Sequence, residues 1–289
     1  MPSPPDVKRL STSESEGSSP NSRLSGRGSR LPPRWGWLFH RFQRYSERYL
    51  SRHFHAIRLS KSSPPLPSGE EPLLVVLNHP SWWDPMIGMA LAPLFKNYVQ
   101  YAAIHAEAVA KYRFFQRIGF VGVDASSLRG AAEFLRVGQA ILAEPRRAFW
   151  VTAQGRFTDV RERPLALRSG VGHLASRLER GLVLPIAIEY SFWNERTPEA
   201  LVRFGDPLAI SDHRHLNGKA WTALIETSLT KALDVLNTET MSREPSRFQT
   251  ILKGRTGIGG MYDLWRRTMS WARGRRFDPS HGDDEENGR

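Results

Sequence analysis

The 289-residue sequence contains no cysteine and no uninterrupted run of eighteen apolar residues. The first absence excludes disulfide bonds and every kind of thiolate chemistry. The second argues against a helix that crosses a bilayer, because such a helix needs roughly 20 predominantly apolar residues. The beginning of the chain also lacks the apolar core of a secretory signal peptide, so we expect no such signal.

Acidic residues are scarce in two flanking segments. Residues 34–61 hold seven basic residues and one acidic residue, and residues 246–276 hold eight basic residues and one acidic residue. The formal net charge is +12, so the rest of the chain is nearly neutral. A basic chain invites the hypothesis of nucleic-acid binding, but such a site would place its charge on the folded domain. Because the charge lies in flanks that also carry aromatic residues, we expect no nucleic-acid partner.

The flank before the central domain has a helical pattern. Aromatic and apolar side chains repeat at helical spacing, and arginines lie beside them. The first set is Trp35, Leu38, Phe39, Phe42, Tyr45 and Tyr49, and the second is Arg34, Arg41, Arg44, Arg48 and Arg52. A helix of this kind suits the interface of a membrane that contains anionic lipids. Docking of the aromatic face on the domain is the other interpretation, and one helix can do both.

Composition divides the chain into five parts. We expect a disordered tail over residues 1–31, an amphipathic membrane-surface helix over 32–60 and a folded domain over 61–240. A basic aromatic segment over 241–277 follows, and it offers a second contact with a membrane surface. The acidic tail over 278–289 is predicted to be disordered.

One stretch of the domain, residues 73–85, organises the rest. Its first five residues form an apolar run that predicts a buried strand, and a turn-like cluster follows. His79 therefore stands at a strand end, where loops commonly carry chemistry in α/β proteins. Pro80 interrupts any helix there, so a turn can return Asp84 to the imidazole ring and fix its tautomer. The alternative is that both residues merely cap the next helix.

The string Asn-His-Pro-Ser-Trp-Trp-Asp-Pro resembles the His-x4-Asp block of the glycerolipid and lysophospholipid acyltransferases. The resemblance implies that His79 is the general base for an acceptor hydroxyl and that Asp84 orients it. Three further stretches resemble the later blocks of this family in the same order, and together the four blocks span roughly residues 70–210. These later stretches are residues 114–124, 154–159 and 182–190.

The second and third blocks depart from the family pattern. Asp124 stands where the family often has an arginine after the second-block strand, and Arg117 and Arg129 flank it as substitutes or as solvated arginines. In the third block the family's Glu is replaced by a glutamine, which is uncharged. The substrate-binding residues implied by the resemblance are Gln154, Gly155, Arg156 and Arg168.

Other arginines and histidines of the domain have simpler interpretations. Arg161 and Arg163 follow the third block and either help to hold an anionic group or pair with neighbouring acids. Histidine pairs at residues 53 and 55 and at residues 213 and 215 lack the partner cluster of a metal site, so no metal is expected. In the fourth block, Pro185 predicts that its strand lies at a sheet edge or carries a bulge.

The resemblance implies a single α/β domain with a mostly mixed sheet flanked by helices, preceded by the amphipathic helix. Periodicity predicts helices near residues 86–96, 130–143 and 221–237, and strands near 73–77, 98–104, 148–153, 182–190 and 201–204. The implied activity is transfer of an acyl group from acyl-CoA or acyl carrier protein to a lysophospholipid or a related lipid. No other cofactor is expected, and the protein is predicted to be peripheral at the cytoplasmic face of a membrane. The alternative is a membrane-binding relative without catalysis, against which the intact His79 and Asp84 argue.

Overall fold

The computed structural model of the chain describes residue 31 and residues 33–254. The predicted acidic tail, nearly all of the predicted N-terminal tail and most of the basic aromatic segment lie outside the described residues. None of the helices in the described part of the chain is both long and apolar enough to cross a membrane.

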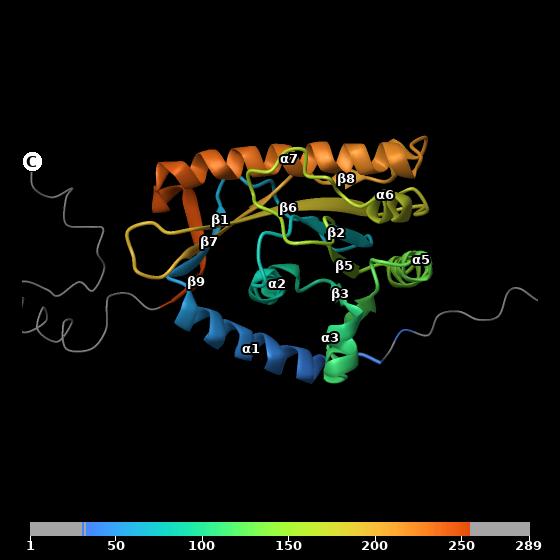
Figure 1. Cartoon of the computed structure of the whole chain (residues 1–289), viewed down its shortest axis with the longest axis horizontal. Helices are drawn as coiled ribbons and strands as arrows, with labels where there is room; N and C mark the ends of the chain where they lie inside the picture. The colour runs from blue at the N-terminus through green and yellow to red at the C-terminus, as the bar shows by residue number, and fades with distance from the viewer. Residues whose placement is uncertain (1–30, 32, 255–289) are drawn as a thin grey trace, which may run out of the picture. The chain divides into compact units, whose positions relative to one another are not determined.

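A mixed sheet forms the centre of the described domain (Figure 1). Its strands are β1 (Ala56–Ser60), β2 (Leu73–Leu77), β3 (Val99–His105), β4 (Phe120–Val123), β5 (Arg147–Thr152), β6 (Leu182–Ser191), β7 (Glu199–Phe204), β8 (Leu208–Ala209) and β9 (Phe248–Lys253). They lie in the order β4-β3-β5-β2-β6-β7-β1-β9, and β8 pairs with β6. The first five strands in this order, from β4 through β3, β5 and β2 to β6, are parallel to one another. Strand β7 is antiparallel to β6. The predicted α/β domain with a mixed sheet is confirmed.

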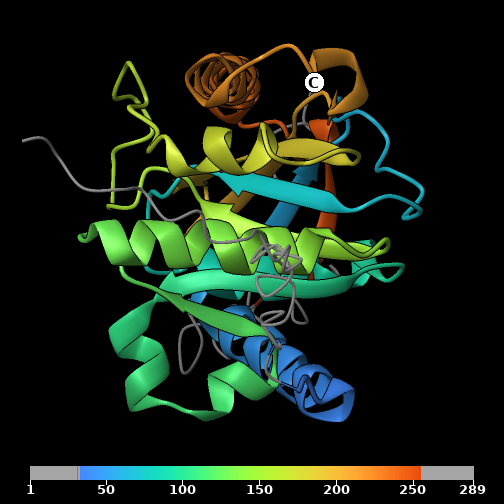
Figure 2. The same ribbon diagram turned by 90° about the vertical axis from the view of Figure 1, so that its right-hand side faces the viewer.

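Helices cover both faces of the sheet (Figures 1 and 2). The α-helices are α1 (Gly36–His53), α2 (Asp84–Leu91), α3 (Ala106–Lys111), α4 (Phe114–Arg117), α5 (Leu128–Leu142), α6 (Gly170–Ala175) and α7 (Gly218–Ser242). The short 3-10 helices are η1 (Ala92–Phe95), η2 (Ser211–His213) and η3 (Pro245–Arg247). Strand β2 is buried on both faces: Leu74 and Val76 pack with α5, α6 and α7, and Leu73, Val75 and Leu77 pack with α1 and α2.

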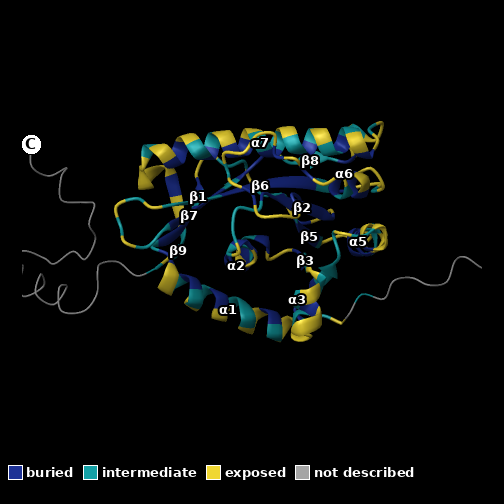
Figure 3. Ribbon diagram, in the orientation of Figure 1, coloured by how far each residue is buried: buried dark blue, intermediate teal, exposed yellow. Residues whose placement is uncertain are grey.

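Helix α1 docks on the domain with one side and leaves the other side exposed, as the banding in Figure 3 shows. Phe39 and Leu50 are buried, whereas Trp37 and Tyr45 are 63% and 56% exposed. The helix ends at His53, so the last residues of the predicted 32–60 segment form β1 instead. Strand β1 pairs with β9, which lies within the predicted basic aromatic segment.

The prediction that Pro185 lies at a sheet edge is wrong, because β6 is an interior strand. The alternative, a bulge, agrees with the pairing, since residues 184–185 of β6 lie opposite residues 205–207. Strand β6 pairs with β2 on one side, and on the other side its partner changes from β8 to β7. Pro185 lies at this change, between the residues paired with β8 and those paired with β7, and its carbonyl accepts a hydrogen bond of 2.8 Å from Gly205 N–H. The missing N–H of Pro185 therefore falls where the partner of β6 changes, and not within an unbroken ladder.

Candidate active site

His79 and Asp84 meet immediately beyond the end of β2. The Nδ1 of His79 lies 2.6 Å from Oδ2 of Asp84, and their side chains are 18% and 1% exposed. A carboxylate only accepts hydrogen bonds, so Nδ1 carries the proton and donates it, and Nε2 is left as the basic ring nitrogen. Helix α2 begins at Asp84, and the turn between His79 and this helix brings the two residues together.

Both carboxylate oxygens of Asp84 have further partners. Oδ2 also accepts a 3.2 Å hydrogen bond from the backbone N–H of Ser81. Oδ1 accepts a 2.6 Å hydrogen bond from the hydroxyl of Tyr190, at the end of β6. Burial, reinforced by the Asp84 carboxylate, raises the pKa of Tyr190 well above its ordinary value, so its hydroxyl stays protonated and remains a donor. The carboxylate of Asp84 is thus held in one orientation although it is removed from water.

The backbone of His79 is held by the loop that follows β5. Its N–H donates to Oε1 of Gln154 at 2.7 Å, and its carbonyl accepts from Thr158 N–H at 2.9 Å. Nε2 of Gln154 donates to the carbonyl of Leu165 at 3.1 Å, so the buried amide is bonded at both ends. Gln154 therefore contacts the general-base candidate through its backbone, and its predicted contact with substrate stays a prediction.

Asn78 joins the His79 segment to β6. Its side-chain amide donates to the carbonyl of Ile188 and accepts from the backbone N–H of the same residue, both at 2.8 Å. The side chain of Asn78 thereby continues the pairing of β2 with β6 beyond Leu77. The ring of Phe157, which is exposed, contacts the imidazole, with ring centroids 4.5 Å apart.

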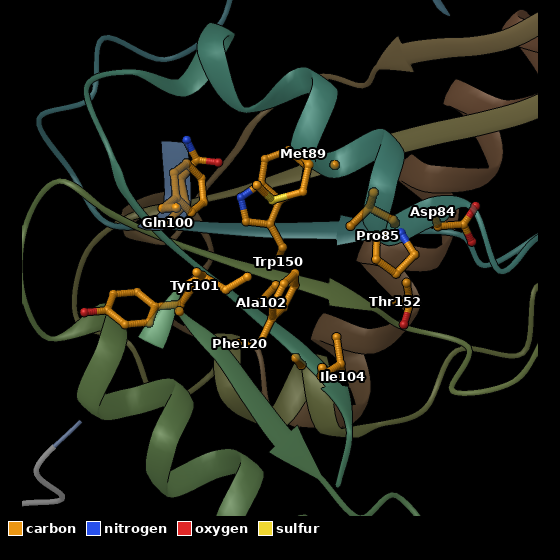
Figure 4. Close-up of a pocket in the computed structure, with 16 residues that line it drawn as sticks. Asp84, Pro85, Met89, Gln100, Tyr101, Ala102, Ile104, Phe120, Trp150 and Thr152 are labelled. Carbon is orange, nitrogen blue, oxygen red and sulfur yellow. The ribbon is translucent and has the colours of Figure 1, made fainter. Parts of the chain in front are cut away.

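An apolar pocket reaches Asp84 from the side of the sheet that carries α1 and α2. Its volume is about 580 Å³ with the open mouth included, and its lining includes Phe39, Met89, Ile104, Ile118, Phe120 and Trp150. Figure 4 shows Asp84 and Thr152 at one end and Gln100 at the other. An apolar lining of this kind suits a small apolar ligand.

The arginines of the third block differ in their partners. Arg156 donates to Glu162 at 2.6 Å on the exposed surface. Arg168 donates to the carbonyl of Ala125 and has no acidic partner among the residues that the structure describes. Gly155 has φ of +63°, and a Cβ there would lie 2.7 Å from Cδ of Arg168. A larger residue at position 155 would therefore be strained in its backbone and would push against the side chain of Arg168, which passes over this position.

The remaining candidates are mostly engaged with neighbours. Arg161 pairs with Asp159 at 2.7 Å, as the simpler interpretation predicts. Arg163 pairs at 2.6 Å with Asp234 of α7, which is not one of its neighbours in the sequence. Arg117 lies over the ring of Trp35, 4.9 Å from its centroid. Arg129 is exposed at the start of α5.

Metal binding finds no support in the part of the chain that is described, where no three His, Asp or Glu side chains form a potential metal group. The rings of His53 and Trp83 contact each other at 5.3 Å, and those of His213 and Trp221 at 5.5 Å.

Tyr190, which lies more than a hundred residues from Asp84 in the sequence, was not predicted to be a site residue. The one signal in the sequence is a polar aromatic residue near the end of a mostly apolar strand. A buried tyrosine usually has a hydrogen-bond partner, but the partner can be identified only from the register of β6 and β2.

In comparison with known protein families, the family model described as Acyltransferase matches residues 51–189. The matched range contains His79, Asp84, Gln154 and Arg168. Comparison with curated proteins gave no match.

Proposed function

We propose that this protein is an O-acyltransferase that uses His79 as its general base, since residues 51–189 match the family model described as Acyltransferase. The observation that carries the proposal is the 2.6 Å contact between His79 and a buried Asp84 at the end of an apolar pocket. Paired in this way, the imidazole can accept a proton at Nε2 while Asp84 stabilises the cation that forms.

In the proposed reaction the acceptor hydroxyl attacks the donor thioester directly, and no acyl-enzyme intermediate forms. Nε2 of His79 removes the proton of the acceptor hydroxyl while the oxygen attacks the thioester carbonyl of the donor. The tetrahedral intermediate then collapses, the C–S bond breaks, and the thiolate takes the proton from His79. The products are an ester and a free thiol, and the imidazole is neutral again.

The pocket fits the acyl chain of an acyl-CoA or acyl carrier protein donor. Gln100 pairs with Ala148, which pairs with Leu73, so the far wall lies six strand residues before His79. At roughly 3.3 Å per residue this is on the order of 20 Å. An extended acyl chain advances about 1.25 Å per carbon, given ~1.5 Å bonds at tetrahedral angles, so about sixteen carbons would span that length.

The acceptor we propose is a lysophospholipid or a related lipid with a free hydroxyl. Arg168 supports a phosphate-bearing acceptor, because its guanidinium has no acidic partner among the described residues, and it crosses Gly155 directly after the residue that holds His79. Guanidinium groups bind phosphate oxygens with paired hydrogen bonds.

We further propose that the protein docks on the cytoplasmic face of a membrane through the outer side of α1. Trp37 and Tyr45 are exposed there, and aromatic rings favour the headgroup region. Arg41, Arg44 and Arg48 are also exposed, without an ion pair to any described acidic side chain. Anionic lipids are enriched in the cytoplasmic leaflet, and they attract a cationic surface of this kind.

The test of catalysis uses purified protein, long-chain acyl-CoA or acyl carrier protein, and a panel of lysophospholipids and other hydroxylated lipids in vesicles. We expect the native protein to form labelled ester and His79→Ala to lose at least about a hundredfold of that activity. His215→Ala, which removes an exposed histidine, is the matched control and should retain full activity. Equal activity of the native and His79→Ala proteins would contradict the assigned base. Inactivity of the native protein with every donor and acceptor would favour the membrane-binding alternative.

The test of docking is co-sedimentation with vesicles that contain or lack anionic lipid. We expect binding to anionic vesicles and a loss of at least about tenfold in partition for the Arg44→Glu, Arg48→Glu double variant, since each lost basic contact costs about 1 kcal/mol. The control is Arg177→Glu, Arg180→Glu, which makes the same change of charge at exposed positions after α6. If both double variants bind equally well, α1 is not the docking surface.

A further inference from the structure

We propose that Tyr190 is a positioning residue for the His79–Asp84 pair, acting only through the Asp84 carboxylate. The inference rests on the proposed function, in which His79 is the base, and adds the residue that keeps its partner in place. Tyr190 lies at the end of β6, one residue beyond the range that the acyltransferase family model matches.

The two oxygens of Asp84 are divided between two different tasks. Oδ2 bonds to the imidazole and to the backbone of Ser81, while Oδ1 bonds to the hydroxyl of Tyr190 at 2.6 Å. The torsion that turns a carboxylate about its Cβ–Cγ bond is soft, so rotamer preference alone does not fix the carboxylate plane. A partner on Oδ1 removes this freedom and keeps Oδ2 directed at Nδ1 of His79.

Burial makes the partner necessary. Asp84 is 2% exposed, so its carboxylate depends on hydrogen bonds from the protein, and Tyr190 supplies the one that Oδ1 accepts. A buried carboxylate oxygen without a hydrogen bond is costly, and Asp84 would shift to regain one. Any such shift would lengthen the bond to His79, on which the orientation of the base depends.

Tyr190 is itself rigidly held, as a positioning residue must be. Its ring contacts that of Phe54 at 5.8 Å, and Phe54 contacts Trp83 at 5.0 Å. The backbone of β6 at Ile188, two residues earlier, is bonded twice to the side chain of Asn78. One strand therefore supports both the residue before the base and the residue that orients the base.

The decisive substitution is Tyr190→Phe, which keeps the ring and removes only the hydroxyl. We expect kcat to fall by about tenfold or more, the size of effect seen when the partner that orients a site residue is lost. KM for the donor should change by less than about twofold, because Tyr190 is not expected to bind the donor. Tyr98→Phe is the matched control, because it also removes the hydroxyl of a buried tyrosine. Tyr98 lies just before β3, and therefore at the opposite end of the parallel strands from His79.

A double-mutant cycle tests whether Tyr190 acts through Asp84. In the Asp84→Ala background, Tyr190→Phe should change kcat by less than about twofold, since no carboxylate remains to be positioned. An equal loss of kcat in both backgrounds would overturn the inference, as would an equal loss of kcat in Tyr190→Phe and Tyr98→Phe.

A measurement that needs no activity separates this inference from the proposed function. In protein with ¹⁵N-labelled histidine, the proton between Nδ1 of His79 and Asp84 should give a downfield resonance, which His79→Ala removes and thereby assigns. Tyr190→Phe should shift or broaden this resonance, and Tyr98→Phe should leave it unchanged. If the signal responds but the native protein is inactive with every donor, the proposed function fails and the positioning role stands. An unchanged signal in Tyr190→Phe would overturn the positioning role even if the protein is an active acyltransferase.

Discussion

The imidazole of His79 owes its placement to neighbours that fix it independently. Asp84 fixes the ring, Gln154 and Thr158 fix the backbone, and Asn78 fixes the preceding residue to β6. Each of these hydrogen bonds involves a buried or partly buried group, so each is costly to lose. These contacts hold the side chain in one place, which is what the proton transfer that we propose for His79 requires.

Gly88 is the position from which the pocket can be narrowed. It lines the pocket on α2, and a Cβ added there meets only Trp150, at 3.9 Å. Gly88→Ala should therefore be tolerated, whereas Gly88→Phe should fill the pocket. We expect Gly88→Phe to lose at least about tenfold in kcat/KM with long-chain donors while short-chain donors keep most of theirs. Assays over a series of donor lengths test this, and an equal loss with every donor would mean that the acyl chain binds elsewhere.

Two elements, β6 and α5, are important for the residues that they contribute at their ends. Strand β6 supplies Ile188 and Tyr190 to the His79 region. Helix α5 begins at a well-defined N-cap, where Ser127 accepts a 3.0 Å hydrogen bond from Gly130 N–H. Asp124, which replaces the family's arginine after β4, accepts hydrogen bonds from the hydroxyls of Ser126 and Ser127. It therefore orders the turn between β4 and α5.

The turn before α5 should make stability depend on pH in the acid range. Hydrogen bonds from Ser126 and then Ser127 lower the pKa of Asp124 from 3.8 to about 2. A carboxyl whose pKa is lower in the folded state stabilises the fold above its unfolded pKa, and this contribution disappears as the pH falls to about 2. We expect Asp124→Ala to lower the melting temperature at pH 7 but not at pH 2. Glu144→Ala, at an exposed carboxylate, is the control, and a pH-independent difference for Asp124→Ala would contradict the prediction.

Across the whole domain, the sheet joins segments that are far apart in the sequence. Strands β7, β1 and β9 lie side by side, and Arg58 links them through its guanidinium. It forms two hydrogen bonds with Glu199, at 2.7 and 3.2 Å, and one with Thr250 at 3.0 Å. The hydrogen bonds of Arg58 therefore connect β1, the strand that follows α1, to β7 and to β9.

Removal of one member of this cluster should destabilise the fold more than removal of an exposed ion pair. Glu199→Ala leaves Arg58 buried without a countercharge, and we expect a loss of about 3–5 kcal/mol in the free energy of unfolding. Lys231→Ala, which breaks the exposed pair with Asp206, should change this free energy very little. Denaturant unfolding compares the two, and equal effects would show that the Arg58–Glu199 pair does not stabilise the fold.

Local patterns in the sequence determined the strand at residues 73–77, the turn after it and the candidate pair of His79 and Asp84. They did so because an apolar run, a proline and a five-residue spacing act within one segment of chain. The same patterns predicted the amphipathic helix, and the resemblance in four blocks predicted both the α/β domain and the match to the Acyltransferase family model.

Only the tertiary structure decided which distant residues serve the site. The hydroxyl of Tyr190 reaches Asp84, Gln154 holds the backbone of His79, and Pro185 lies in an interior strand rather than at an edge. Strands β1 and β9 pair although the composition of the chain assigned them to its flanks. Each of these facts depends on strand order and register, which are set by packing between segments remote in the chain. A pattern read along one segment contains no information about the segment that will lie beside it.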